Sequence, residues 1–225
     1  MLISALIGGI VMMSVFDLYV QTSYSTQTSS STTDMQTQVK AAMDFMVKEL
    51  RLMQGLPTIT STVSANDTIR FMRVEDSGYS SGGNSPTTLS DTSKAWKTNR
   101  FASSVSGSYT VAIQVGKSVG EVHPIANNTS TALTLLDTWG TIPDTSSLFL
   151  ISRTKTFSRT ADNMLRYQIG TGTPNVIAAN ITSLSFTQSD PVSLVITVTG
   201  RTANPDPNTG AYKYFTLTDT ARKRN

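Results

Sequence analysis

Few side chains of this sequence could carry out chemistry. The chain has a single histidine, His123, which precedes Pro124 in a loop-like stretch, and it has no cysteine. Catalysis needs an acid, a base or a nucleophile that converges with an activating partner, and a lone histidine of this kind is more often structural or solvated. The sequence also contains no nucleophile-elbow, phosphate-binding or metal-helix motif. We therefore predict that the protein is not an enzyme and holds no cofactor.

Asp206 is the residue that could attract a metal ion. It lies between Pro205 and Pro207, with Asn204 and Asn208 beside them, and these oxygen-bearing side chains suit calcium. The segment lacks the carboxylate density of a calcium-binding loop, so we expect no metal site. Glycosylation is a second kind of modification that the sequence permits, because Ser/Thr-rich loops can accept O-linked sugars. The Asn-x-Ser/Thr sequons begin at Asn66, Asn127, Asn128 and Asn180.

The charge of the chain argues against nucleic-acid binding. The net charge is +3 and the pI is about 9.2, and much of the basic excess lies in the last residues, Arg222, Lys223 and Arg224. A nucleic-acid site needs a basic stripe with interleaved aromatic side chains, and the sequence has no such stretch. We do not expect DNA to be a partner.

The first twenty residues, MLISALIGGIVMMSVFDLYV, form a nearly unbroken apolar run. As a helix they would span about 30 Å, enough to cross the hydrocarbon core of a bilayer. No lysine or arginine precedes the run, as one would in a complete secretory signal or signal anchor, so we expect that the original start of the chain is missing. Such a stem has to be covered by lipid or by neighbouring protein, and we expect it to be covered by copies of itself.

A second helical pattern follows a Ser/Thr-rich segment. Residues 21–34 could form a weak helix or a linker, because hydroxyl and β-branched side chains compete with helical hydrogen bonds. From residue 35 to 53 apolar residues recur at spacings of three and four, which predicts a helix with one apolar stripe. Thr33 or Asp34 could cap its start, and Gly55 followed by Pro57 should end it. The residues expected to pack this helix on the rest of the protein are Met35, Val39, Met43, Met46, Leu50 and Met53.

Beyond Pro57 the pattern changes from a helical period to the two-residue period of a strand. The alternation is clearest over residues 109–115. Further strands are expected at 68–74, 148–153, 164–169, 183–187, 194–199 and 213–218. Residues 76–94 and 200–210 should be loops, and the second should join two hairpin strands.

These patterns predict an α+β protein in which a long N-terminal helix, apolar stem plus amphipathic half, packs on an antiparallel β-sheet head. We divide the chain into a hydrophobic stem (1–20), a Ser/Thr-rich segment with the amphipathic helix (21–55) and a β-rich globular head (56–225). The head is rich in Ser, Thr, Asn and Gly and poor in Lys and Glu, which favours an exported surface. Without cysteine, its stability has to come from packing alone.

The stem and the C-terminal strands resemble a known family. The run MLISALIGGIVMMSVF resembles the apolar stem of type IV pilins and type II secretion pseudopilins, beginning just after the family's processing signal. VKAAMDFMVKELRLMQG (39–55) is similar to the second half of the long helix in PilW-like minor pilins and J-type pseudopilins. NITSLSFT (180–187), LVITVTGRT (194–202) and FTLTDTARKRN (215–225) are similar to the last strands of that group, whereas 56–179 shows no such similarity. The chain lacks the family's glutamate before Met1 and the cysteines of many members.

The resemblance implies a structural subunit of an extracellular type IV pilus-like filament at the cell surface, which polymerises through its N-terminal helix. Its partners would be copies of itself in a helical filament, the inner membrane that anchors it before assembly, the pilus assembly machinery, and a host surface or glycan. Glycines at positions 8 and 9 would let helices approach closely, and Asp17 would be satisfied by water or by a neighbouring cation. The expected assembly interface consists of Met1, Leu2, Ile3, Leu6, Ile7, Gly8, Gly9, Ile10, Val11, Val15, Phe16, Asp17 and Leu18.

Two other functions are compatible with the same sequence. A minor or tip pilin, or a pseudopilin that primes assembly, would have the same fold but would be present in very few copies. A membrane-anchored surface adhesin would instead bind its target through the loops at 76–94 and 200–210.

Overall fold

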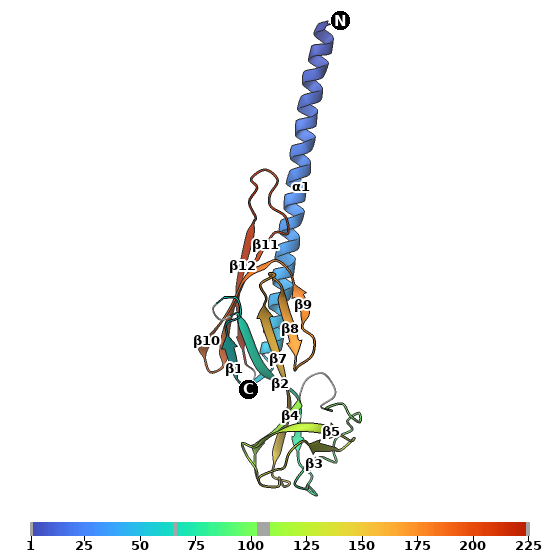
Figure 1. Cartoon of the computed structure of the whole chain (residues 1–225), viewed down its shortest axis with the longest axis vertical. Coiled ribbons are helices and arrows are strands. Elements are labelled where there is room, and N and C mark those ends of the chain that lie inside the picture. The colour runs from blue at the N-terminus through green and yellow to red at the C-terminus, as the bar shows by residue number, and fades with distance from the viewer. Residues whose placement is uncertain (1, 65–66, 103–108, 224–225) are drawn as a thin grey trace.

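The computed structural model describes residues 2–64, 67–102 and 109–223, and for residues 2–6 it describes the backbone alone. The described chain forms one long helix followed by β-strands (Figure 1). The α+β class expected from the sequence is therefore confirmed. The elements are α1 (Leu2–Leu50), β1 (Met53–Thr60), β2 (Thr68–Tyr79), β3 (Thr88–Ser90), β4 (Tyr109–Val115), β5 (Val122–Asn128), β6 (Ala132–Leu135), β7 (Leu148–Arg159), β8 (Leu165–Ile169), β9 (Asn175–Ala178), β10 (Ile181–Asp190), β11 (Ser193–Arg201) and β12 (Tyr214–Arg222).

Helix α1 is continuous through the Ser/Thr-rich segment, so residues 21–34 are helix and not a linker. Thr33 and Asp34 lie inside the helix, so the prediction that one of them caps a helix N-terminus is wrong. The hydroxyl side chains remain compatible with the helix because they donate to the backbone carbonyl four residues earlier. Such hydrogen bonds, 2.7–3.0 Å long, are made by Ser14, Thr22, Thr26, Thr32, Thr33 and Thr37.

The helix ends at Leu50, earlier than the expected end at Gly55 and Pro57. Both of these residues lie in β1, and Met53, expected on the helix, is the first residue of that strand. Pairing with β2 takes over from the helix at this point, because Met53 pairs with Arg73. A register shift between Gln54 and Thr58 accommodates the left-handed Gly55, with a φ of 69°.

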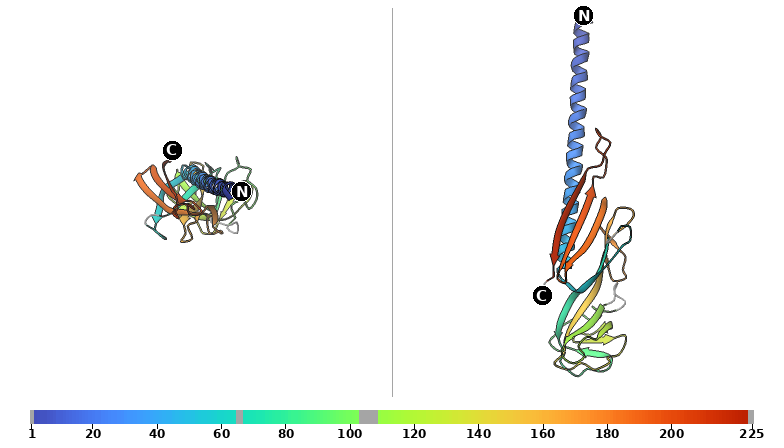
Figure 2. Two further views of the ribbon diagram at one scale, coloured as in Figure 1. Left: turned by 90° about the horizontal axis from the view of Figure 1, so that it is seen from above. Right: turned by 90° about the vertical axis from the view of Figure 1, so that its left-hand side faces the viewer.

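Two antiparallel sheets form the head. The larger has the strand order β1-β2-β7-β4-β5-β6-β3, with β8 beside β7 and β9 beside β8, and the smaller has the order β10-β11-β12. β7 pairs with β2, β4 and β8 and runs through most of the head. The second half of α1 lies against the sheets, whereas its first half extends beyond them (Figures 1 and 2).

The described head contains two hydrophobic clusters. The first, which we call the proximal lobe, joins the second half of α1 to β8–β12 and to the nearer parts of β1, β2 and β7; Met46, Phe157 and Ile196 are fully buried in it. The second, the distal lobe, is built from β3–β6 and the far ends of β2 and β7, around Phe101 and Phe149. It lies at the end of the molecule opposite the N-terminus (Figure 1).

The strands expected from the sequence are present, and that at 109–115 has the expected bounds. β1, β3, β5, β6 and β9 were not expected. The segment 76–94 is only partly a loop, because β2 continues to Tyr79 and β3 lies within it, whereas most of 200–210 does join β11 to β12. The short strands escape prediction because three or four residues carry too little periodicity.

Candidate assembly interface

The stem, residues 2–20 of α1, projects away from the head (Figures 1 and 2). From Ile7 to Tyr19 its large apolar side chains are between 55% and 74% exposed, whereas Val20 is part-buried. Met1 lies outside the described residues, and the side chains of Leu2, Ile3 and Leu6 are likewise not described. The exposed members are Ile7, Ile10, Val11, Met12, Met13, Val15, Phe16, Leu18 and Tyr19.

These apolar side chains surround the helix instead of forming a stripe. At about 100° per residue, the nine positions leave no gap wider than about 60° around the axis. A helix that is apolar on all sides belongs in a protein core or in lipid, so one partner on one side would leave most of this surface exposed. Sequence reasoning left out Met12, Met13 and Tyr19, which the all-round pattern includes.

The small and polar positions of the stem are open. Nothing lies within 4 Å of a Cβ atom built on Gly8 or Gly9, so a neighbouring backbone could approach both positions closely. Ser14 donates to the carbonyl of Ile10 at 3.0 Å and leaves no unsatisfied hydroxyl. Asp17 is exposed. Where its side chains are described, from Ile7 to Tyr19, the stem is therefore exposed and available to other molecules.

The second half of α1 fixes the stem to the head. The six residues expected to pack it there are all buried, at 6% exposure or less, although Met53 does so from β1. β11 approaches the helix closely at Gly200, where an added Cβ would lie 2.5 Å from Cγ2 of Val39. The methionine-rich stripe is thus core packing, as expected from its spacing.

A buried ionic cluster ties the last turn of α1 to the larger sheet. Glu49 accepts hydrogen bonds from Lys155 (2.9 Å), Arg73 (3.0 Å) and the Tyr167 hydroxyl (3.2 Å), and Glu75 lies 3.5 Å from Lys155. Burial alone would raise the pKa of Glu49, but the hydrogen bonds and positive charges of Lys155 and Arg73 lower it below its ordinary value. Burial and the negative charge of Glu49 raise the pKa of Tyr167. Glu49 is therefore held as an anion.

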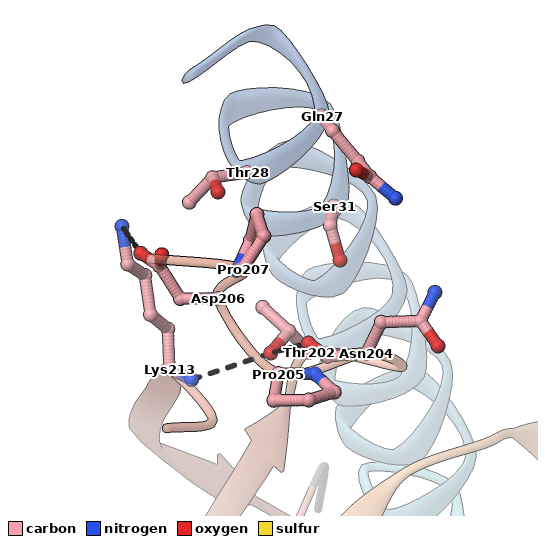
Figure 3. A pocket seen from close by; sticks show the side chains of 9 residues that line it. All are labelled: Gln27, Thr28, Ser31, Thr202, Asn204, Pro205, Asp206, Pro207 and Lys213. Carbon is pink, nitrogen blue, oxygen red and sulfur yellow. Dashed lines mark hydrogen bonds and ion pairs between the residues drawn. The ribbon is translucent and has the colours of Figure 1, made fainter. Parts of the chain in front are cut away.

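The loop between β11 and β12 lies beside α1 just below the stem. Pro207 lies next to Thr28 and Ser31 of the helix (Figure 3). The Thr202 hydroxyl accepts from the Lys213 amide at 3.2 Å and donates to the Asn204 carbonyl at 2.8 Å, so the loop is held by its own hydrogen bonds. The cavity between loop and helix is about 20 Å³, room for about one water molecule. This loop packs against the helix, and a wider, open groove of about 510 Å³ lies beside the cavity, lined by Asp206, Asn208 and Lys213 of the loop and by hydroxyl residues of α1.

The Asp206 carboxylate has its partners within this loop. It accepts from the backbone N–H of Asn208 at 2.9 Å and pairs with Lys213 at 3.3 Å. The hydrogen bond from Asn208, together with Lys213, keeps the pKa of Asp206 below its ordinary value. The Asp206 carboxylate is therefore already paired with an ammonium group.

His123 lies buried in the distal lobe between two carboxylates. Its Nδ1 is 2.8 Å from Asp137 and its Nε2 is 3.0 Å from Glu121, while Trp139 packs edge-on at 4.4 Å between ring centroids. Glu121 also accepts from the amides of residues 140 and 141. Because the carboxylates lie on opposite ring nitrogens, the three groups do not converge. Within the described ranges no group of three or more His, Cys, Asp or Glu side chains could hold a metal ion.

The sequons differ in their surroundings. Asn66 lies outside the described residues, and Asn127 is exposed. Asn128 is 1% exposed; it accepts from the Phe101 amide at 2.8 Å and donates to two backbone carbonyls. Asn180 adopts a left-handed backbone with a φ of 59°. A glycan on Asn128 would require the distal lobe to open, which leaves Asn127 as the accessible position of the pair.

Within the ranges that the structure describes, no helix meets the length and hydropathy needed to cross a membrane. No protein-family model, no curated protein and no solved structure matches this chain.

Proposed function

We propose that this chain is a structural subunit of an extracellular, type IV pilus-like filament that polymerises through the stem. The observation that carries the proposal is the all-round exposure of apolar side chains from Ile7 to Tyr19 on a helix that extends beyond the head. A single contact on one side would leave most of these side chains in water, whereas a bundle of stems covers them all. The resemblance of the first sixteen residues to pilin stems supports the same assignment.

The energetics of the exposed stem favour association. Nine large side chains at this exposure leave on the order of 1,000 Å² of apolar surface, worth roughly 25 kcal/mol when it is removed from water. Before assembly we propose that the inner membrane covers this surface, and that the assembly machinery transfers the stem into the filament. Apolar contacts then serve in both surroundings, so the difference between lipid and bundle governs assembly. Gly8 and Gly9 suit the bundle, because they let backbones approach.

The test is a charge in the stem. Ile10→Asp places a carboxylate at a side chain that is 59% exposed in the single chain and covered in the filament. We expect sheared filaments to fall roughly tenfold or more, because a carboxylate in apolar surroundings costs at least about 2.5 kcal/mol. Leu56→Asp, at a similarly exposed residue of the head, is the matched control and should leave filaments intact. Normal filament yield from Ile10→Asp, with the head folded by circular dichroism, would refute the proposal.

The two rival functions make different predictions. A tip or priming subunit shares the stem contacts, and only its copy number in sheared filaments, counted by mass spectrometry, separates it from the abundant subunit. A membrane-anchored adhesin would use the loops at 76–94 and 200–210. Polar groups in both loops bond within the chain: Asn84 bonds Ser80, Ser90 and the Pro143 carbonyl, and Asp206 bonds its own loop. This internal bonding favours the filament subunit.

A further inference from the structure

The outer face of β7 changes composition along its length. Alternate residues of the strand point into the two hydrophobic clusters, and Phe149, Ile151 and Phe157 are fully buried there. The other alternate residues lie on the outer face; most of them are part-buried, whereas Ser152 is fully buried beside Thr110. In the proximal lobe these are hydroxyl residues, from Thr154 to Ser158, as expected for the solvated face of an antiparallel sheet. In the distal lobe they are Leu148 and Leu150, so this half of the outer face is apolar instead of polar.

The neighbouring strands extend this apolar surface. Leu148 pairs with Tyr79 of β2 and with Val115 of β4, and Leu150 pairs with Ala112, which pairs with Val122 of β5. Directly paired residues share one face of a sheet. Tyr79 is 59% exposed, Val115 53% and Val122 54%. We call this surface the distal face. Its exposed apolar members are Tyr79, Val115 and Val122; Leu148 and Leu150 are part-buried, and Ala112 is 5% exposed. Ser77, which pairs with Leu150, adds an exposed hydroxyl, and none of these residues is charged.

The distal face points sideways from the molecule. β2 and β7 run along its long axis in both side views (Figures 1 and 2), so the face of their sheet looks away from that axis. A stacked neighbour at the end of the molecule would not reach it, but a neighbour alongside would. The stem lies at the opposite end of the molecule (Figure 1), so contacts between stems do not themselves cover the distal face.

The size of the distal face limits the kind of contact that it can make. The exposed apolar area is on the order of 400 Å², about half of the roughly 800 Å² that each partner of a stable complex buries. Two free chains would therefore not pair through it. Many such contacts in register along two filaments would hold, because each contact raises the effective concentration of the next.

We propose that the distal face packs on the distal face of a second copy of this chain in a neighbouring filament, and so joins filaments side by side. This inference rests on the proposed filament function. Two parallel filaments can be related by a two-fold axis along their length, which lets one patch meet itself. Copies within one filament lack such an axis. Two uncharged sheet faces then pack with their side chains interleaved, at about 10 Å between sheets.

The experiment uses the absence of cysteine from the chain. Val115→Cys places a thiol on the distal face, at an exposed residue that ends β4. Thr156→Cys places one on the polar half of the same sheet face as a matched control. Full-chain filaments are treated with a short bis-maleimide. We expect at least about fivefold more covalent dimer from Val115→Cys than from the control, because only the distal face is repeatedly apposed.

A second variant removes the contact without opening the core. Tyr79→Thr combined with Val122→Thr gives the distal face the polarity of the proximal half, and both positions are more than half exposed. We expect bundles to become single filaments in electron micrographs and the Val115→Cys dimer to fall to the control level, with an unchanged melting temperature.

The outcomes separate the two proposals. Filaments without excess Val115→Cys dimer, or bundles that persist in the double variant, would overturn the distal-face contact and leave the filament subunit standing. An equal dimer yield from chains dispersed in detergent would also overturn it, because the contact would then belong to free dimers. Absence of filaments from the unaltered chain would overturn the filament function, and the inter-filament contact with it.

Discussion

Glu49→Gln should destabilise the junction between α1 and the head more than its size suggests. Glutamine keeps the shape of the side chain but removes the negative charge 2.9 Å from Lys155, which is 4% exposed. Breaking a buried ion pair by removing one partner costs about 3–5 kcal/mol, because a buried charge is left uncompensated. Glu75 remains 3.5 Å from Lys155, which places the expected loss near the lower end, at about 3 kcal/mol.

Urea denaturation of the full chain in mild detergent measures this loss. With a slope of about 2 kcal/mol per molar urea, the midpoint should fall by about 1.5 M. Circular dichroism follows α1, and fluorescence of Trp96 and Trp139 follows the distal lobe. The circular dichroism signal should therefore be lost at a lower urea concentration than the fluorescence signal. Asp162→Asn breaks an exposed pair with Arg166 of the same 2.9 Å length and should leave the urea midpoint almost unchanged, because exposed ion pairs contribute little to stability.

The pH dependence gives an independent check of the same reasoning. The folded pKa of Glu49 lies below its ordinary value of 4.5, so the unfolded chain takes up the proton first as the pH falls. The stabilisation by Glu49 is therefore complete above about pH 4.5 and is lost as the pH falls through the folded pKa. The difference in unfolding free energy between wild type and Glu49→Gln should therefore become smaller as the pH falls toward 3. A cost below about 1 kcal/mol at pH 7, or a gap that stays constant with pH, would refute the account.

Two further substitutions probe contacts that position the helix and the first hairpin. Gly200→Ala should weaken the packing of β11 on α1 and lower the melting temperature, since its Cβ would lie 2.5 Å from Val39. Adding Val39→Ala to the same chain should recover part of that decrease. If the two substitutions instead lower the melting temperature additively, the steric explanation is wrong. Asp67→Asn should lower the free energy of unfolding by about 2 kcal/mol in urea denaturation. The fully buried carboxylate accepts hydrogen bonds from the backbone N–H groups of Thr62, Val63 and Ser64 at 2.6–2.7 Å. The side-chain amide of asparagine cannot accept all three, because its nitrogen is a donor. An Asp67→Asn chain as stable as wild type would contradict that reading.

The parts of the fold that the sequence predicts are those in which local pattern and tertiary packing agree. The apolar stripe from Met35 to Leu50 has a helical period and is buried over that length. Residues 109–115 alternate and form β4 with the same bounds. In both cases the side-chain period follows directly from the backbone that buries it.

Prediction fails where tertiary contacts decide between local alternatives. Residues 21–34 have poor helix formers, but their hydroxyls bond the helix's own carbonyls, and the helix continues on both sides. Gly55 and Pro57 are ordinary helix terminators, yet β1 pairing with β2 ends the helix earlier, and both residues fall at a register shift. A strand partner twenty residues away leaves no trace in local periodicity.

The same distinction applies to the candidate interface. Composition alone predicts the apolar stem, because no fold of the head could cover a helix that extends beyond it. The cluster that fixes the stem's direction could not be predicted, since Lys155 and Tyr167 lie 106 and 118 residues from Glu49 in sequence. The distal face was missed for a related reason: Tyr79, Val115 and Val122 belong to three strands, and only the pairing register brings them together.

The two exposed apolar surfaces differ in a way that orders their use. The stem is apolar on all sides and on the order of 1,000 Å² is exposed, so a chain whose stem is in water gains from the first neighbours it meets. The distal face is flat, one-sided and less than half as large, so it gains little until many copies are aligned. α1 runs without interruption from the stem to Glu49, where buried ion pairs join it to β2 and β7, the strands that carry Tyr79 and Leu148. Packing of the stems would therefore also set the direction in which each distal face points, and lateral joining would follow polymerisation.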